Sequence, residues 1–198
     1  MRQFVVLGHE APTHPDFDLD DLAGGAGRLD LLCRCVNAGL LTSHGIREDA
    51  RVWLVIDDAV TVRFEGADLR GLHPDERAIA GLVRSALDAA RDAVGHRSVE
   101  ASPGVAASSR GLEPVLSEVA ADGTVIHLHE DGAPIADRAP PDDPIFLLSD
   151  HRSVTAAEAD RVAAVADRRA RLGPVAVHAD HAVAVAGNYC DTGGFERY

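Results

Sequence analysis

Lysine is absent from the 198 residues, so all 19 basic side chains are arginines. They are outnumbered by 32 acidic residues, which gives a formal net charge of −13 at pH 7, and aromatic residues make up only 4% of the chain. At about 1 M salt the Debye length is only about 3 Å, so charges on such a surface repel one another little. The composition therefore favours a protein that works at very high salt. An ordinary acidic protein from a GC-rich genome is the alternative.

The acidic charge would normally argue against a nucleic-acid partner. Screening at high salt weakens that objection, so the net charge decides nothing about RNA. Salt also weakens contacts to phosphate, and we therefore expect an RNA site to depend on arginine forks, stacking and shape.

Several motifs are missing as well. No apolar run reaches the roughly 20 residues of a membrane span, and the start lacks a signal-peptide pattern, which predicts a cytoplasmic protein away from membranes. Gly24–Gly27 has no lysine to complete a phosphate-binding loop, and neither G-x-G-x-x-G nor G-x-S-x-G occurs. Cys33 and Cys35 are too close together for a zinc knuckle and Cys190 has no partner, so we expect reduced thiols and no metal.

In the first two thirds of the chain, short apolar runs alternate with helical periodicity. Residues 8–27 form a long loop, which is either a solvated loop or a substrate-side loop. Arg28 and Asp30 open the helix that follows, either as ordinary helix-end charges or in a substrate role. The expected elements are a strand over Gln3–Leu7, a helix over Arg28–His44, a hairpin of Arg51–Ile56 with Val60–Phe64, a helix from His73 to Val94 capped by Gly95, a turn or strand start over Ser102–Val105 and a helix from Ser108 to Ala121.

The C-terminal third reads as strand, loop, strand, helix, short strand and helix. Strands alternating with helices predict an α/β fold with a parallel sheet, which binds its ligand at the carboxyl ends of the strands. Those ends are Leu128, Ser149 and the segment from Val177 to Ala179. The expected elements are strands over Thr124–Leu128, Pro144–Leu148 and Val175–His178, a turn over Glu130–Gly132, a helix from Thr155 to Arg171 and a small-residue segment over Ala182–Gly187.

The segments VIHLHEDG, FLLSDH and LGPVAVHADHAVAVAGNY, in this order, resemble the cofactor region of the SPOUT RNA methyltransferases. Within them the chain is most similar to the archaeal tRNA pseudouridine-54 N1-methyltransferases, because RQFVVLGHEAPT, DLAGGAGRLDLLCRCV, SHGIRED and SPGV also stand where that family has them. The resemblance runs over essentially the whole chain. It implies one domain over residues 1–198, with a mostly parallel sheet, helices on both faces, a β-hairpin insertion and a deep trefoil knot over about 124–198.

The resemblance further implies a homodimer that uses S-adenosylmethionine (SAM) to methylate N1 of pseudouridine 54 in tRNA, with no role for DNA. Ser149 stands where many relatives have glycine, and Ala182 where some have cysteine. Arg28 and Asp30 are expected on the RNA side, with Asp30 orienting the arginine or accepting the N1 proton. The expected SAM contacts are Leu128, Ser149, Leu172, Gly173, Val177 and Ala182. A methyltransferase of ribosomal-RNA pseudouridine and a non-catalytic RNA-binding or nucleotide-sensing module are the alternatives.

Removal of salt should unfold the protein, because the repulsion among its acidic side chains is then no longer screened. We expect circular dichroism to show loss of helical signal when the protein is dialysed from molar to low salt. Full retention of structure at low salt would contradict the prediction of a salt-dependent protein.

Overall fold

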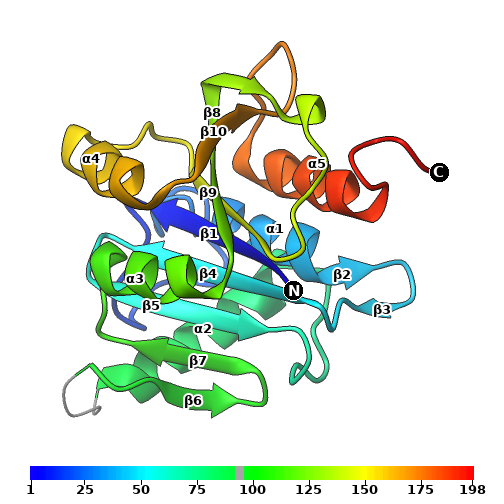
Figure 1. Ribbon diagram of the computed structural model, residues 1–198. Helices are drawn as coiled ribbons and strands as arrows, with labels where there is room; N and C mark the ends of the chain where they lie inside the picture. The colour runs from blue at the N-terminus through cyan, green and yellow to red at the C-terminus, as the bar shows by residue number, and fades with distance from the viewer. Residues whose placement is uncertain (92–95) are drawn as a thin grey trace.

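The computed structural model describes residues 1–91 and 96–198 (Figure 1). Eight strands form one sheet in the order β10-β8-β9-β1-β4-β5-β7-β6. They are β1 (Arg2–Gly8), β4 (Ala50–Ile56), β5 (Val60–Glu65), β6 (Val99–Ser102), β7 (Val105–Ser108), β8 (Thr124–Pro134), β9 (Pro144–Ser149) and β10 (Arg168–Arg171). The short strands β2 (Leu41–Thr42) and β3 (Gly45–Ile46) form a separate hairpin.

Four of the seven strand pairings in the large sheet are parallel, and they join β10, β8, β9, β1 and β4. The remaining strands, β5, β7 and β6, continue the sheet by antiparallel pairing. The predicted hairpin is formed by β4 and β5, which are connected through Asp57 and Asp58, both at φ 50°. The sheet is therefore mostly parallel, as the sequence predicted.

Helices cover both faces of the sheet (Figure 1). Alternate residues of β1 point to opposite faces, so Phe4 and Val6 belong to one apolar core while Val5 and Leu7 belong to another. The first core includes residues of α1 (Leu29–Leu40), α2 (Glu76–Arg91) and α5 (Ala179–Asp191), and the second includes residues of α3 (Leu112–Asp122) and α4 (Ala156–Val165). No helix in the described ranges is long and apolar enough to span a membrane.

The single tryptophan, Trp53, lies at the centre of the second core and is fully buried. Its indole N–H donates to the side-chain oxygen of Gln3 over 2.8 Å, which satisfies a polar group that would otherwise be buried without a partner. The guanidinium groups of Arg51 and Arg63 lie 5.5 and 5.4 Å from the ring centroid. Cation–π contacts therefore add to apolar packing at the middle of β4.

The structure corrects the predicted helix over Thr155–Arg171. Helix α4 ends at Val165, and β10 then pairs in parallel with β8. The change of direction is fixed by Asp167, whose backbone N–H donates to the carbonyl of Val125 while its side chain accepts from the Val125 N–H. An arginine-rich strand of four residues has no apolar alternation, so periodicity gave no signal for it.

The predicted strand over Val175–His178 is also wrong. These residues form an irregular loop, in which Val175 is 73% exposed and Val177 is 50% exposed. The predicted turn over Glu130–Gly132 falls inside β8, which continues to Pro134. Its pairing with β10 is nevertheless interrupted there, since the register passes from His127–Arg169 directly to Ala133–Ala170.

Most other predicted elements exist with shifted ends. Helix α1 ends at Leu40, four residues before the predicted end at His44, and β2 and β3 follow it. Helix α2 begins at Glu76 and not at His73, and α3 begins at Leu112 and not at Ser108. Ser102 ends β6 and Val105 begins β7, in agreement with the turn or strand start that the sequence indicated. The predicted end of α2 at Val94 and its cap at Gly95 lie outside the described residues.

Gly132 allows β8 and β10 to approach closely. A Cβ atom at this position would lie 2.4–2.5 Å from backbone atoms of Ala170, whereas a Cβ at Gly173 would meet nothing within 4 Å. We therefore expect Gly132→Ala to lower the free energy of unfolding by about 1–3 kcal/mol through overpacking. Urea denaturation measures the change, and Gly173→Ala is the matched control that should leave stability almost unaltered. Equal stability of the two variants would contradict this account of the β8–β10 contact.

Candidate functional site

A cavity of about 280 Å³ lies at the carboxyl ends of β9 and β10, beside the middle of β8 and next to the first turn of α5. All six residues that the resemblance assigned to the cofactor line it, namely Leu128, Ser149, Leu172, Gly173, Val177 and Ala182. The six residues thus lie together, and their contact with a cofactor stays a prediction; the third strand ends at Arg171 and not at Val177. The topology explains the convergence, because parallel strands place their carboxyl ends at the same edge of a sheet.

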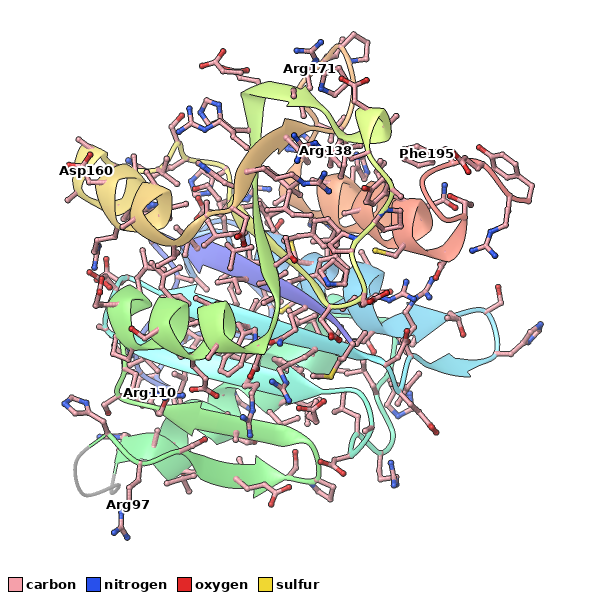
Figure 2. The ribbon with its side chains drawn as sticks, in the orientation of Figure 1. Arg97, Arg110, Arg138, Asp160, Arg171 and Phe195 are labelled. Carbon is pink, nitrogen blue, oxygen red and sulfur yellow. The ribbon has the colours of Figure 1, made fainter. Side chains whose placement is uncertain are left out.

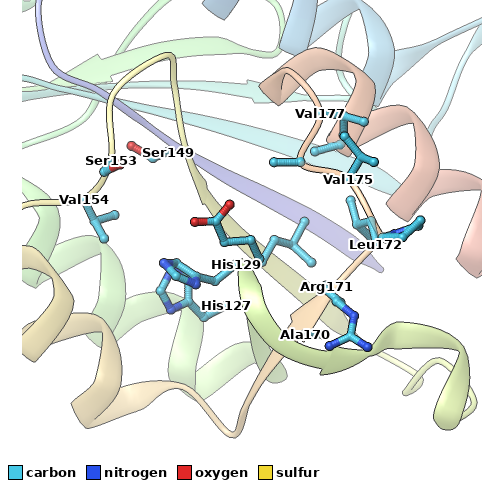
Figure 3. Close-up of a pocket in the computed structure, with 16 residues that line it drawn as sticks. His127, His129, Ser149, Ser153, Val154, Ala170, Arg171, Leu172, Val175 and Val177 are labelled. Carbon is cyan, nitrogen blue, oxygen red and sulfur yellow. The ribbon is translucent and has the colours of Figure 1, made fainter.

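The cavity has walls of different chemistry (Figure 3). Ser149, Ser153 and Val154 lie on one side, and Leu172, Val175 and Val177 lie on the opposite side. The lining thus combines hydroxyl groups on the β9 side with an apolar wall on the β10 side. This combination suits a ligand with an apolar body and a few polar groups.

The loop over residues 173–177 adds backbone donors to this cavity. Among the described residues, the N–H groups of Gly173, Val175, Ala176 and Val177 donate to no other group of the protein. Every one of these residues lines the cavity. Free amides beside a concave apolar surface are available to a polar ligand edge, because backbone N–H groups need a partner.

His127 lines the cavity as well, outside the set of residues that the sequence assigned to the cofactor. It is 3% exposed, and burial lowers the pKa of its imidazole to about 4, with the nearby Arg169 and His129 acting in the same direction. The ring is therefore neutral at pH 7. In residues 1–91 and 96–198 no group of three or more His, Cys, Asp or Glu is arranged to hold a metal ion.

Arg28 and Asp30 lie outside the cavity lining and pair with each other. Arg28 Nε and Nη2 donate to the two carboxylate oxygens of Asp30 over 3.0 and 3.2 Å. Arg28 has a left-handed backbone with φ 65°, next to Gly27 at φ 52°. A Cβ on Gly27 would lie 1.7 Å from the Glu10 carbonyl oxygen, so only glycine allows this entry into α1.

Sequence analysis missed the residue that connects this pair to the rest of the site. Arg34 donates from Nη1 to Asp30 over 2.8 Å and to Glu76 over 3.1 Å, and from Nε to Asp180 over 3.1 Å. One guanidinium group therefore joins α1, α2 and the first turn of α5. Its partner on α5, Asp180, lies two residues before Ala182, which lines the cavity. Asp30 and Arg34 are spaced i,i+4 on a helix, which is the sequence signal that could have identified half of this network.

The hydrogen bonds from Arg28 and Arg34 determine the protonation state of Asp30. Burial acts to raise the pKa of this carboxyl group, but hydrogen bonds from Arg28 and Arg34 bring it below the ordinary value. Asp30 is therefore ionised and already accepts three hydrogen bonds. This favours its role in orienting arginine over a role as proton acceptor.

The cysteines do not offer a reactive thiolate. Cys33 and Cys35 are fully buried in the first core, and burial raises the pKa of each thiol far above its ordinary value. Burial also raises the pKa of Cys190, to about 11. All three are free thiols, and a thiol with such a pKa is a poor nucleophile at neutral pH.

The arginines are distributed over the whole molecule. In Figure 2, Arg97 and Arg110 lie beside β6 and β7, whereas Arg138 and Arg171 lie at the opposite end, near β10 and η1 (Ile135–Asp137). Many arginines pair with acids, for example Arg110 with Glu118 over 2.8 Å. Pairs of this kind hold guanidinium groups in place, and the dependence of an RNA site on arginine forks stays a prediction.

Comparison with known proteins agrees with this geometry. A family model described as "Putative SAM-dependent RNA methyltransferase" matches residues 1–195. The chain is 58% identical to the tRNA (pseudouridine(54)-N(1))-methyltransferase of Haloferax volcanii and 59% identical to that of Haloarcula marismortui, over 100% of both chains in each case. The protein of the same name from Methanosarcina mazei is 37% identical, over 100% of this chain and 94% of its own.

The fold also has a counterpart among solved structures. The crystal structure of Archaeoglobus fulgidus Nep1 bound to S-adenosylhomocysteine superposes with a TM-score of 0.66, at 12% identity, over 96% of this chain and 97% of that chain. This likeness supports the α/β fold. The family match over residues 1–195 and the identity of 58–59% to full-length relatives show that the chain belongs to the family of SAM-dependent RNA methyltransferases that includes the tRNA (pseudouridine(54)-N(1))-methyltransferases.

Proposed function

We propose that this protein transfers the methyl group of SAM to N1 of pseudouridine 54 in tRNA. The observation that carries the proposal is the convergence of the six cofactor residues on one cavity, in a chain whose full-length relatives are named for this reaction. N1 of uridine is bonded to the sugar, whereas N1 of pseudouridine carries a hydrogen. Only the carbon-linked isomer therefore offers a nitrogen that can be methylated.

The residues of the cavity fit SAM. Leu128, Leu172 and Ala182 form apolar surface on which an adenine ring would pack. The free N–H groups of the four non-proline residues in the 173–177 loop would pair with its polar edge. SAM supplies an electrophilic methyl group on its sulfonium sulfur. His127, the buried ring in the lining, is neutral at pH 7 and adds no positive charge beside that sulfonium. The small side chain of Ala182, 8% exposed, leaves room for close approach of the ligand to α5.

The tRNA side of the reaction is assigned to Arg28 and Asp30. A planar guanidinium group held by a carboxylate is oriented for a two-pronged contact with phosphate. Asp30 holds the Arg28 fork in place, and Arg34 ties Asp30 to Asp180 in the first turn of α5. The protein contributes chiefly by positioning, since methyl transfer to nitrogen needs alignment of three atoms and loss of one proton.

Further properties of the family are proposed for this chain. One domain spans residues 1–198 in the cytoplasm, residues 124–198 form the trefoil knot, and β4 with β5 is the hairpin insertion of the SPOUT fold. Two copies pair next to the cofactor cavity. The exposure of Val175 and Val177 beside that cavity supports the pairing, because adjacent exposed apolar side chains often mark an interaction surface.

Ala182→Phe should abolish binding of SAM while the protein stays folded, because the larger ring fills the cavity from its α5 side. Isothermal titration calorimetry with S-adenosylhomocysteine measures the affinity. Ala184→Phe is the matched control, since Ala184 is exposed on the same helix and does not line the cavity. Normal affinity in a folded Ala182→Phe protein would place the cofactor elsewhere.

Arg28→Ala should lose methyl transfer while its affinity for SAM stays near normal. Loss of hydrogen bonds from a charged donor costs about 1.5–3 kcal/mol, so we expect a roughly ten- to hundredfold loss in tRNA affinity or transfer rate. Cofactor binding, tRNA binding and methyl transfer are measured on one preparation of the folded variant.

Arg84→Ala is the control for this experiment, because Arg84 is an exposed arginine on α2. If Arg28→Ala lowers only the melting temperature and keeps full activity per folded molecule, Arg28 is structural. If SAM binding fails while tRNA binding survives, the Arg28–Asp30 pair belongs to the cofactor side.

A further inference from the structure

His9 follows β1 directly and is held between two acidic side chains. Its Nδ1 lies 2.9 Å from Asp150 Oδ1, and its Nε2 lies 3.1 Å from Glu158 Oε2. The three side chains are largely removed from solvent, at 14% exposure for His9, 2% for Asp150 and 11% for Glu158. The backbone N–H of His9 donates to the other oxygen of Asp150 over 2.9 Å.

This geometry defines the charge of the ring. An ionised carboxylate oxygen only accepts hydrogen bonds, and a neutral imidazole has one donor and one acceptor nitrogen. Both ring nitrogens of His9 face a carboxylate oxygen, so both must donate. His9 is therefore an imidazolium cation that bridges Asp150 and Glu158.

Both acids are fixed to the loop that forms the serine side of the cavity. Asp150 follows Ser149, and its Oδ1 also accepts from the backbone N–H of Arg152 over 2.9 Å. Glu158 Oε2 accepts from the backbone N–H and the hydroxyl of Thr155, over 2.7 and 2.8 Å, in a capping box at the start of α4. Ser149, Ser153 and Val154, which line the cavity, lie on the segment held at these two points.

We propose that cationic His9 is a positioning residue for the cofactor, because it fixes both ends of the loop over residues 149–155 against β1. The inference rests on the proposed function, in which SAM occupies this cavity. His9 itself does not line the cavity and touches no reacting atom. Its effect passes through Asp150 to Ser149 and through Glu158 and Thr155 to Val154.

We call the arrangement in which His9 bridges Asp150 and Glu158 the clamp. The charged groups around it determine how the clamp responds to pH. Burial acts to lower the pKa of His9, but the hydrogen bonds to Asp150 and Glu158 raise it above the ordinary value of 6.5. The charged or titratable groups around these acids include His151, 3.4 Å from Asp150, and the pair of Glu10 and Arg152. Arg28 is a further one, and its pKa is raised chiefly by the hydrogen bond to Asp30 and to a smaller extent by the charge of Asp150. The clamp is thus complete at pH below the pKa of His9 in the folded protein, and it is lost as the pH rises through that value.

His9→Gln should weaken the binding of S-adenosylhomocysteine by roughly five- to 150-fold, the usual range for coupling between two sites. Gln keeps a donor for one acid but cannot bridge both as a cation. Calorimetry from about pH 6 to pH 9 covers the titration range of histidine. Wild-type affinity should fall as the pH rises, whereas His9→Gln should be weak throughout. His44→Gln is the matched control, because His44 is exposed in the turn between β2 and β3.

Glu158→Gln provides a readout that a purely structural role would not change. Glutamine at this position retains the capping box, since Glu and Gln serve equally there, but it removes one of the two charges that favour the imidazolium. The affinity of Glu158→Gln for S-adenosylhomocysteine should therefore fall at a lower pH than that of the wild type.

Three results would overturn the proposal: normal affinity in His9→Gln, a wild-type affinity that is constant over the pH range, or an equal loss in His44→Gln. A lower melting temperature of His9→Gln with unchanged affinity would make His9 a stabilising residue only. Failure of the proposed function is distinguishable, because the wild type would then not bind S-adenosylhomocysteine, or Ala182→Phe would bind it normally.

Discussion

Parallel pairing of β9 with β1 on one side and β8 on the other is the contact on which the site depends. It places Ser149 beside Leu7, two residues before His9, and aligns Leu147 with His127. The strands β1 and β9, far apart in sequence, therefore end at one edge of the sheet, which β8 passes at His127 and Leu128. The cavity forms where they end, because β10 reaches the same edge and its loop turns back toward α5.

Exposed ion pairs and partly buried ion pairs have different effects in this protein. Exposed pairs such as Arg91 with Asp88, 4.0 Å apart, contribute little to stability, particularly at high salt. Arg34 is different, because its one side chain donates to acids from three helices, and Asp30 and Asp180 are 8% and 13% exposed. Such a partly buried network orients its members, and here it links the first turn of α1 with the first turn of α5.

Sequence patterns predicted the alternation of strands and helices, and the six residues that the family resemblance assigned to the cofactor all line one cavity. Periodicity could not find β10, since only Ala170 of its four residues is buried. It also assigned a strand to Val175 and Val177, because apolar character usually means burial, whereas a ligand cavity or an interface leaves such residues exposed. The contacts of His9 and Arg34 join positions more than 140 residues apart, which no local pattern reports.

Trp53 gives the molecule a built-in optical reporter. It is the only tryptophan, is fully buried on the α3 side of the sheet, and is absent from the lining of the cavity. Its fluorescence therefore follows the environment of the central strand β4, and its emission shifts when water reaches the sheet. A variant whose emission spectrum matches that of the wild type keeps an intact sheet, so any loss of ligand affinity in that variant arises at the cavity itself.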